Sequence, residues 1–112
     1  MAVAVLDILP ESISSDYFYY DPSLSCLSLG KYSTLREIAL AQEIKAMDGC
    51  GAMEYYTMGH YVESAPKTHY KSTYHPSYLL DPVRWLMFTV LFLFSNKPHM
   101  LNYLFIFLWL QF

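Results

Sequence analysis

The distribution of charge along the chain constrains its fold more than any other feature, because it changes abruptly at Pro82. Residues 1–82 contain five basic and ten acidic side chains, whereas Arg84 and Lys97 are the only charged residues that follow. A shift of this size within 112 residues indicates two regions of different character. We therefore expect one partial domain over residues 1–82, and an unrelated apolar tail over residues 83–112 that is not a domain.

The tail contains two apolar runs that are too short to cross a bilayer. They are Trp85–Phe94 and Leu101–Phe112, separated by the polar segment Ser95–His99. A membrane-spanning helix needs about 20 apolar residues, and a continuous span would place a lysine and a proline inside the membrane. The runs also lack the polar face of an amphipathic helix or of a half-buried strand pair. We expect no stable membrane partner, although a small membrane-associated protein remains an alternative.

Three segments in the first region have the composition of strands. The apolar run Ala2–Leu9 predicts a strand buried on both faces in the middle of a sheet, and Pro10 ends it. The aromatic segment Asp16–Tyr20 predicts a second strand, antiparallel to the first because the link between them is short. Met53–Val62 predicts a third strand, in which Gly59 indicates a bulge or a close backbone approach.

One main helix is predicted over Lys31–Met47. Gly49 follows its end, and Thr34 and Glu37 have the spacing of a capping box. If the helix instead begins at Gly30, Thr34 belongs to its first turns. The residues that follow one face at helical spacing are Leu35, Ile38, Ala39 and Gln42. The order of strand, strand, helix and strand is that of an α/β or α+β domain. Residues 63–82 are predicted to form an ordered loop with room for one short element.

The two cysteines, Cys26 and Cys50, have no metal-ligand spacing. We interpret them as reduced thiols of a cytoplasmic protein. The apolar start of the chain is not preceded by basic residues and is interrupted by Asp7, so it does not have the pattern of a secretory signal.

Three segments in the same order carry a resemblance to a known family. They are VLDILPESISSDYFYYDP (Val5–Pro22), LSLGKYSTLREIAL (Leu27–Leu40) and EYYTMGHYVESAPKTHYKSTYHPSYLLDP (Glu54–Pro82). Together they resemble the C-terminal domain of the arginyl-tRNA–protein transferases, truncated at both ends. That family transfers arginine from Arg-tRNA to the N-terminal amine of proteins that begin with Asp or Glu, in the N-degron pathway of protein degradation.

The resemblance implies a mixed sheet like that of the N-acetyltransferase (GNAT) fold, with one main helix. It places the donor-side loop at Ser25–Gly30, so that Ser28 and Gly30 are predicted to contact the donor. A helix N-terminus offers free amides and a partial positive charge to such a ligand. The resemblance implies Arg-tRNA as co-substrate, no cofactor or metal ligand in this segment, and a location in the cytoplasm and also the nucleus.

Two further predictions concern catalysis and tRNA. Asp21 is the candidate general base, with an ordinary turn residue as the alternative. A second group matches the family pattern PK-x-x-YK-x-x-Y-x-P, and its lysines are predicted to bind tRNA phosphate or the acidic acceptor while its rings stack on bases. The alternative is a solvated basic loop with packed tyrosines. The residues of this group are Lys67, Tyr70, Lys71 and Tyr74.

The leading hypothesis is a portion of an aminoacyltransferase that is inactive alone. The alternative from another class is a non-catalytic isoform that binds tRNA or the full-length enzyme. A read-through of an intron would explain the tail, because Val83-Arg84 is what an in-frame splice signal of the type GTA-AGA encodes.

Overall fold

The computed structural model describes residues 1–62, 64–81, 86–89 and 104–109. They belong to two compact units, one of residues 1–56 and one of residues 57–109. Within these described ranges, no helix has both the length and the apolar composition that crossing a membrane requires. The predicted boundary at Pro82 lies outside the described residues.

The first unit begins with a hairpin of β1 (Ala2–Ile8) and β2 (Ser12–Tyr20), which pair antiparallel as the sequence predicts. The turn is tight, since the amide of Leu9 donates to the carbonyl of Ser12 at 2.8 Å. This turn lets β2 begin four residues before the predicted start at Asp16. The register shifts between Val5 and Leu6, which marks a bulge or irregularity in the ladder.

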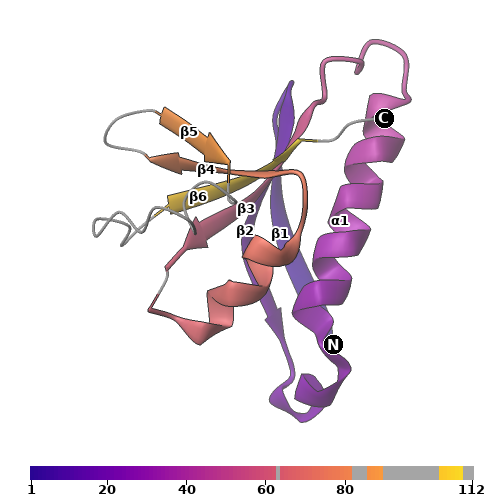
Figure 1. The fold of residues 1–112 in the computed structure, drawn as a ribbon. Helices are drawn as coiled ribbons and strands as arrows, with labels where there is room; N and C mark the ends of the chain where they lie inside the picture. Colours follow the sequence, from indigo (N-terminus) through magenta and orange to yellow (C-terminus); the bar gives the residue numbers. More distant parts are fainter. Residues whose placement is uncertain (63, 82–85, 90–103, 110–112) are drawn as a thin grey trace. The chain divides into compact units, whose positions relative to one another are not determined.

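Helix α1 (Leu29–Lys45) connects the end of β2 to strand β3 (Tyr55–Tyr61), whose first two residues belong to the same unit. The amides of Glu54 and Tyr55 donate to the carbonyl of Glu11 at 2.8 and 3.0 Å. Because Glu11 immediately precedes β2, β2 and β3 start at the same end and run in the same direction (Figure 1). The antiparallel hairpin and this parallel neighbour form a mixed three-stranded sheet, and α1 packs on β2.

The prediction that the first strand is buried on both faces is wrong. Every residue of β1 is exposed or half-buried, and Ile8 remains 59% exposed. The buried strand is β3, where Tyr56 and Met58 are 1% and 4% exposed. Among the described residues β1 occupies an edge, paired with β2 alone. A short apolar run has the same composition in an edge strand as in a central strand. The sequence pattern alone therefore could not distinguish the two positions in the sheet.

Helix α1 also differs from its prediction in its start and in its buried face. It begins at Leu29, close to the alternative start at Gly30, and Thr34 Oγ1 donates to the carbonyl of Gly30 at 3.0 Å. Thr34 therefore lies in the second turn, and the predicted capping box does not form. Leu35, expected on the buried face, is 58% exposed. The residues that α1 buries are Ser33, Thr34, Glu37 and Ala41.

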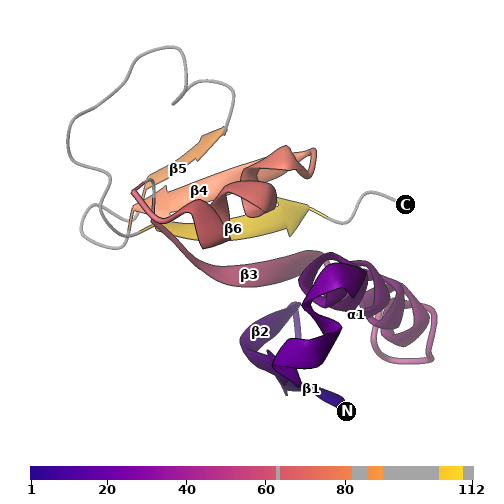
Figure 2. The same cartoon turned by 90° about the horizontal axis from the view of Figure 1, so that it is seen from below.

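The described residues of the second unit form a 3₁₀ helix and three strands besides the rest of β3. Helix η2 (Pro66–Thr73) occupies much of the predicted loop. Strand β4 (Ser77–Asp81) pairs antiparallel with β5 (Leu86–Thr89) on one side and with β6 (Leu104–Trp109) on the other (Figure 2). Strands β5 and β6 lie in the two apolar runs of the tail, and each of them pairs with β4. Backbone pairing of this kind does not require an alternating polar face.

Candidate functional site

The N-terminal end of α1 has an unusual backbone at the predicted donor loop. Ser28 precedes the helix in the left-handed region, with φ 51° and ψ 43°, and its side chain makes no capping hydrogen bond. Its carbonyl accepts from the amides of Lys31 and Tyr32 at 3.0 and 3.3 Å. The amides of Leu29 and Gly30 precede the first intrahelical hydrogen bond, so they have no partner within the helix. A left-handed serine costs of order 1–2 kcal/mol, and such strain is concentrated at functional sites.

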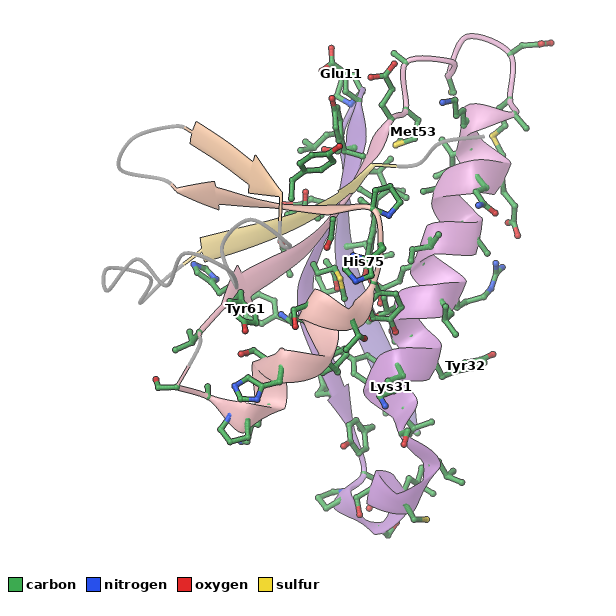
Figure 3. All side chains as sticks on the ribbon, viewed as in Figure 1. Glu11, Lys31, Tyr32, Met53, Tyr61 and His75 are labelled. Atoms are coloured by element: carbon green, nitrogen blue, oxygen red, sulfur yellow. The ribbon has the colours of Figure 1, made fainter. Side chains whose placement is uncertain are left out.

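Side chains next to this loop differ in their exposure. Tyr32 is 65% exposed and points away from the sheet (Figure 3). Lys31 is also exposed, while Gly30 is half-buried on the face of α1 that packs on the sheet. The loop therefore has an accessible outer side with an aromatic ring and a positive charge, as a nucleotide or phosphate ligand requires.

Asp21, the predicted general base, caps the 3₁₀ helix η1 (Pro22–Leu27) that leads into this loop. Its Oδ1 accepts from the amide of Ser23 at 2.9 Å, and its carbonyl accepts from the amide of Leu24 at 2.9 Å. The hydrogen bonds from Ser23 lower the pKa of the exposed Asp21 carboxyl. A lowered pKa weakens a carboxylate as a base. Its catalytic role stays a prediction, and its geometry is that of a capping residue.

A buried carboxylate that the sequence reasoning did not identify lies between α1 and β3. Glu37 is 4% exposed, and both of its carboxylate oxygens accept hydrogen bonds. The hydroxyl of Ser33, one turn earlier, donates to Oε1, and the hydroxyl of Tyr56 donates to Oε2 at 2.5 Å. We call these three residues the Glu37 cluster. The signal in the sequence was the series of small and polar residues at Gly30, Ser33, Glu37 and Ala41, which lie on one helical face.

The electrostatics of the Glu37 cluster keep Tyr56 protonated. Burial is the largest cause that raises the pKa of Tyr56, followed by its hydrogen bond to Glu37 and the charge of that carboxylate. Hydrogen bonding with Ser15 and Thr34 acts in the opposite direction. The ion pair between Arg36 and Glu43 lies on the exposed side of α1. Within the described residues, the hydrogen bonds that the Glu37 carboxylate accepts come from the hydroxyls of Ser33 and Tyr56.

The predicted tRNA-binding residues lie on η2 in the second unit, except for Tyr74, which immediately follows it, and their two lysines differ. Lys67 is exposed, whereas Lys71 is half-buried and its Nζ donates to the carbonyls of Met58 and His60 at 2.7 and 3.0 Å. Burial lowers the pKa of Lys71. Tyr70 and Tyr74 are both half-buried, consistent with partial packing.

The predicted residues fall into two groups. Asp21, Ser28 and Gly30 belong to the first unit, and the four residues from Lys67 to Tyr74 belong to the second. Over the described ranges, no three His, Cys, Asp or Glu side chains are grouped as metal ligands would be. Cys26 is an exposed free thiol and Cys50 a half-buried one.

Comparison with known proteins gives a consistent picture. The family model described as "Arginine-tRNA-protein transferase, C terminus" matches residues 1–81. The chain is 50% identical over 91 residues to arginyl-tRNA–protein transferase 1 of Drosophila melanogaster, covering 80% of this chain and 18% of the fly protein. It is 44% identical over 102 residues to arginyl-tRNA–protein transferase 2 of Arabidopsis thaliana, covering 88% of this chain and 16% of the plant protein. The second alignment extends past Pro82, because it covers 88% of the 112 residues.

Bacterial proteins that are named for a different transfer activity are also similar. The aspartate/glutamate leucyltransferase of Pseudomonas fluorescens is 36% identical over 87 residues, which cover 78% of this chain and 34% of the bacterial protein. The chain thus spans less than a fifth of the length of the arginyl relatives and about a third of the leucyl relative. Since the family model matches well over half of the chain, this protein belongs to the arginine-tRNA-protein transferase family and corresponds to part of its C-terminal region.

Proposed function

We propose that this chain is part of an aminoacyltransferase that transfers arginine from Arg-tRNA to the N-terminal amine of proteins beginning with Asp or Glu. The observation that carries the proposal is the family match over residues 1–81, which contains the strained Ser28 at the start of α1. A strained backbone beside free helix amides, within a segment similar to transferases, suits the binding of an aminoacyl donor.

The arrangement around this loop supports a GNAT-like fold as part of the same proposal. An antiparallel hairpin is followed by a crossover helix and a strand parallel to β2. In the GNAT fold, a strand, loop and helix in this order hold the acyl donor. The donor proposed here is the 3′ aminoacyl-adenosine of a tRNA, with Ser28 and Gly30 as its contacts.

The names of the relatives bear on which part of the reaction this segment serves. Relatives named for arginyl and for leucyl transfer align with the same segment. A segment that both kinds share suits the common steps of tRNA-end binding and amine attack better than the choice of amino acid. The words "aspartate/glutamate" in the bacterial name support an acidic acceptor.

The chemistry that the site must perform is modest. An α-amine has a pKa of about 7.7–8.0, so part of it is neutral and nucleophilic near neutral pH. It attacks an activated ester, and holding the two reactants together supplies much of the acceleration. A general base increases the rate of such a reaction by about 10²–10⁴-fold. Of the two roles considered for Asp21, general base and turn residue, its capping geometry and lowered pKa support the turn residue. The proposed contacts of tRNA or acceptor are Lys67, Tyr70, Lys71 and Tyr74.

A segment exchange tests the proposal. The matching segment of the Drosophila transferase is replaced by that of this chain, and transfer of labelled arginine from Arg-tRNA to a peptide beginning with Asp is measured. We expect transfer to the Asp peptide and none to a matched peptide beginning with Ala. An exchanged enzyme that is folded but transfers no arginine contradicts the proposal. If the 112-residue chain nevertheless binds Arg-tRNA, it is a non-catalytic tRNA-binding protein.

We also propose a location in the cytoplasm and nucleus. The support is that Cys26 and Cys50 are both free thiols, as is usual in reducing compartments. Fluorescence imaging that finds the tagged chain in the secretory pathway would contradict this location.

A further inference from the structure

The Glu37 cluster buries a carboxylate at a position where an apolar side chain of similar size would often give equal or greater stability. A buried carboxylate loses its hydration, and replacing such groups with apolar side chains of similar size is often neutral or stabilising. Within the described residues, Glu37 accepts its hydrogen bonds from the hydroxyls of Ser33 and Tyr56. Polar groups of this kind provide directional bonds that fix one arrangement of two elements, which apolar contacts do less precisely.

The cluster is connected to the donor loop through the body of α1. Gly30 and Glu37 are seven residues apart, which places them on the same face of the helix, about 10 Å and two turns from each other. Between them Thr34 donates to the carbonyl of Gly30 at 3.0 Å. The bond from Tyr56 fixes this face of α1 against the start of β3. A rotation or slide of α1 that broke this bond would therefore move Gly30 as well.

We propose that Glu37 is a positioning residue, whose hydrogen bonds with Ser33 and Tyr56 hold α1 in register on β3 and thereby keep Ser28–Gly30 in the geometry that receives the donor. This inference rests on the proposed function, in which Ser28 and Gly30 contact the aminoacyl end of the tRNA. Direct participation in proton transfer does not suit Glu37, because it is buried, both of its oxygens already accept hydrogen bonds, and it lies two helical turns from that end.

Two substitutions separate positioning from acid–base chemistry. Glu37→Gln keeps a planar group that can accept from one hydroxyl and donate to the other, since hydroxyl hydrogens rotate. It removes the negative charge and the basicity. Glu37→Leu keeps the volume and removes both bonds. Glu43→Gln is the matched control, because Glu43 lies on the same helix with its side chain 56% exposed.

The experiment uses the 112-residue chain and an arginyl-adenosine analogue in which a 3′-amide replaces the ester. Affinity is measured by calorimetry between pH 6 and 8, and amide hydrogen exchange is measured over residues 29–33. For Glu37→Leu we expect about tenfold weaker binding and about tenfold faster exchange. For Glu37→Gln both values stay within about threefold of the unmodified chain across the pH range, and Glu43→Gln changes neither.

Each other result has a definite meaning. If Glu37→Leu binds the analogue and exchanges like the unmodified chain, the inference is wrong. If Glu37→Gln is impaired as strongly as Glu37→Leu, charge and not hydrogen bonding matters, and the inference is also wrong. If the unmodified chain does not bind the analogue while Glu37→Leu still accelerates exchange, the donor-binding proposal fails but the positioning of α1 stands.

A second variant covers the case in which Glu37→Leu does not fold. Tyr56→Phe removes one hydroxyl and leaves the bond from Ser33 in place. We expect it to weaken binding of the analogue by about threefold and to accelerate exchange at the start of α1. Unchanged values for both would overturn the inference.

Discussion

The ammonium group of Lys71 lies 2.7 Å from the carbonyl oxygen of Met58 and donates a hydrogen bond to it. A second bond, to the carbonyl of His60, is 3.0 Å long. Together they fasten η2 to β3 within the second unit. The two lysines predicted to bind tRNA therefore have different surroundings, because Lys71 already uses two of its three donors while Lys67 is exposed.

Substitution by methionine should affect stability at Lys71 and tRNA binding at Lys67. Lys71→Met removes two bonds to backbone carbonyls and should lower the free energy of unfolding by about 1–3 kcal/mol. Lys67→Met should change it by less than about 0.5 kcal/mol. If Lys67 contacts a tRNA phosphate, its loss should reduce the slope of log affinity against log salt by about 1. Urea unfolding and tRNA titration at several salt concentrations measure both effects, and a Lys71→Met chain as stable as the original would contradict the first.

The pair of aspartates on the hairpin predicts a pH-dependent stability. The charge of Asp16, the largest cause, and its hydrogen bond raise the pKa of the exposed Asp7 carboxyl. A raised carboxyl pKa means that the folded state binds the proton more tightly than the unfolded state, so ionised Asp7 disfavours folding. Asp7→Asn should therefore raise the unfolding midpoint at pH 7. The advantage should disappear below the ordinary value of 3.8, where Asp7 is protonated in both states.

A control for this prediction is Asp48→Asn, which changes an exposed carboxylate in the turn after α1. It makes the same change in net charge without affecting the pair of aspartates. Thermal unfolding from pH 3 to 8 compares the two variants. Equal effects of both substitutions at pH 7 would mean that net charge, and not the repulsion between Asp7 and Asp16, sets the stability.

The buried face of α1 gives a third prediction. Ala41 is fully buried, so Ala41→Leu adds three carbons to a filled space and should cost about 1–3 kcal/mol of stability. Leu35 is 58% exposed, and Leu35→Lys should change the stability by less than about 0.5 kcal/mol. Chemical denaturation measures both. If Leu35→Lys instead cost more stability than Ala41→Leu, the buried face of α1 would be the one that hydrophobic periodicity predicts.

The errors of sequence interpretation on α1 have one physical cause. Periodicity assigns the buried face to apolar residues, and it selected Leu35, whereas the helix buries Glu37 because hydroxyls from Ser33 and Tyr56 satisfy its oxygens. Tyr56 is 19 residues away, so the pairing could not be read from the spacing within the helix. The strand-rich composition and the helix itself were predictable, since branched and aromatic runs and the glycines after Lys45 are local signals.

The difference between local signals and contacts distant in sequence also explains which features of the strands were predictable. The antiparallel β1–β2 pair followed from a short link between two apolar runs, and it is confirmed. The burial of β3 in place of β1 depends on which neighbours pack around each strand, and composition carries no such information. Gly59 was predicted as a special position in β3, and its φ of 73° is in the region that glycine adopts without strain.

The last prediction separates the two roles considered for Asp21. Its Oδ1 accepts from the amide of Ser23, which lowers its pKa, so its titration midpoint should lie below the ordinary 3.8. A lowered carboxyl pKa contributes stability that is present above the unfolded-state value and lost as the pH falls through the folded-state value. Carbon-13 NMR of the labelled side chain measures this midpoint. A midpoint at or above 3.8 would mean that the bond to Ser23 does not persist in solution.

The two roles predict different patterns of activity in the segment-exchanged enzyme. Asn accepts the same hydrogen bond from Ser23, so Asp21→Asn should keep the loop and the transfer rate if Asp21 only caps η1. Asp21→Ala should then reduce the affinity for Arg-tRNA with little change in kcat, because the loop before α1 loses its cap. A general base requires the carboxylate itself, so both substitutions would lower kcat by about 10²-fold or more. The capping geometry and the lowered pKa lead us to expect the first pattern.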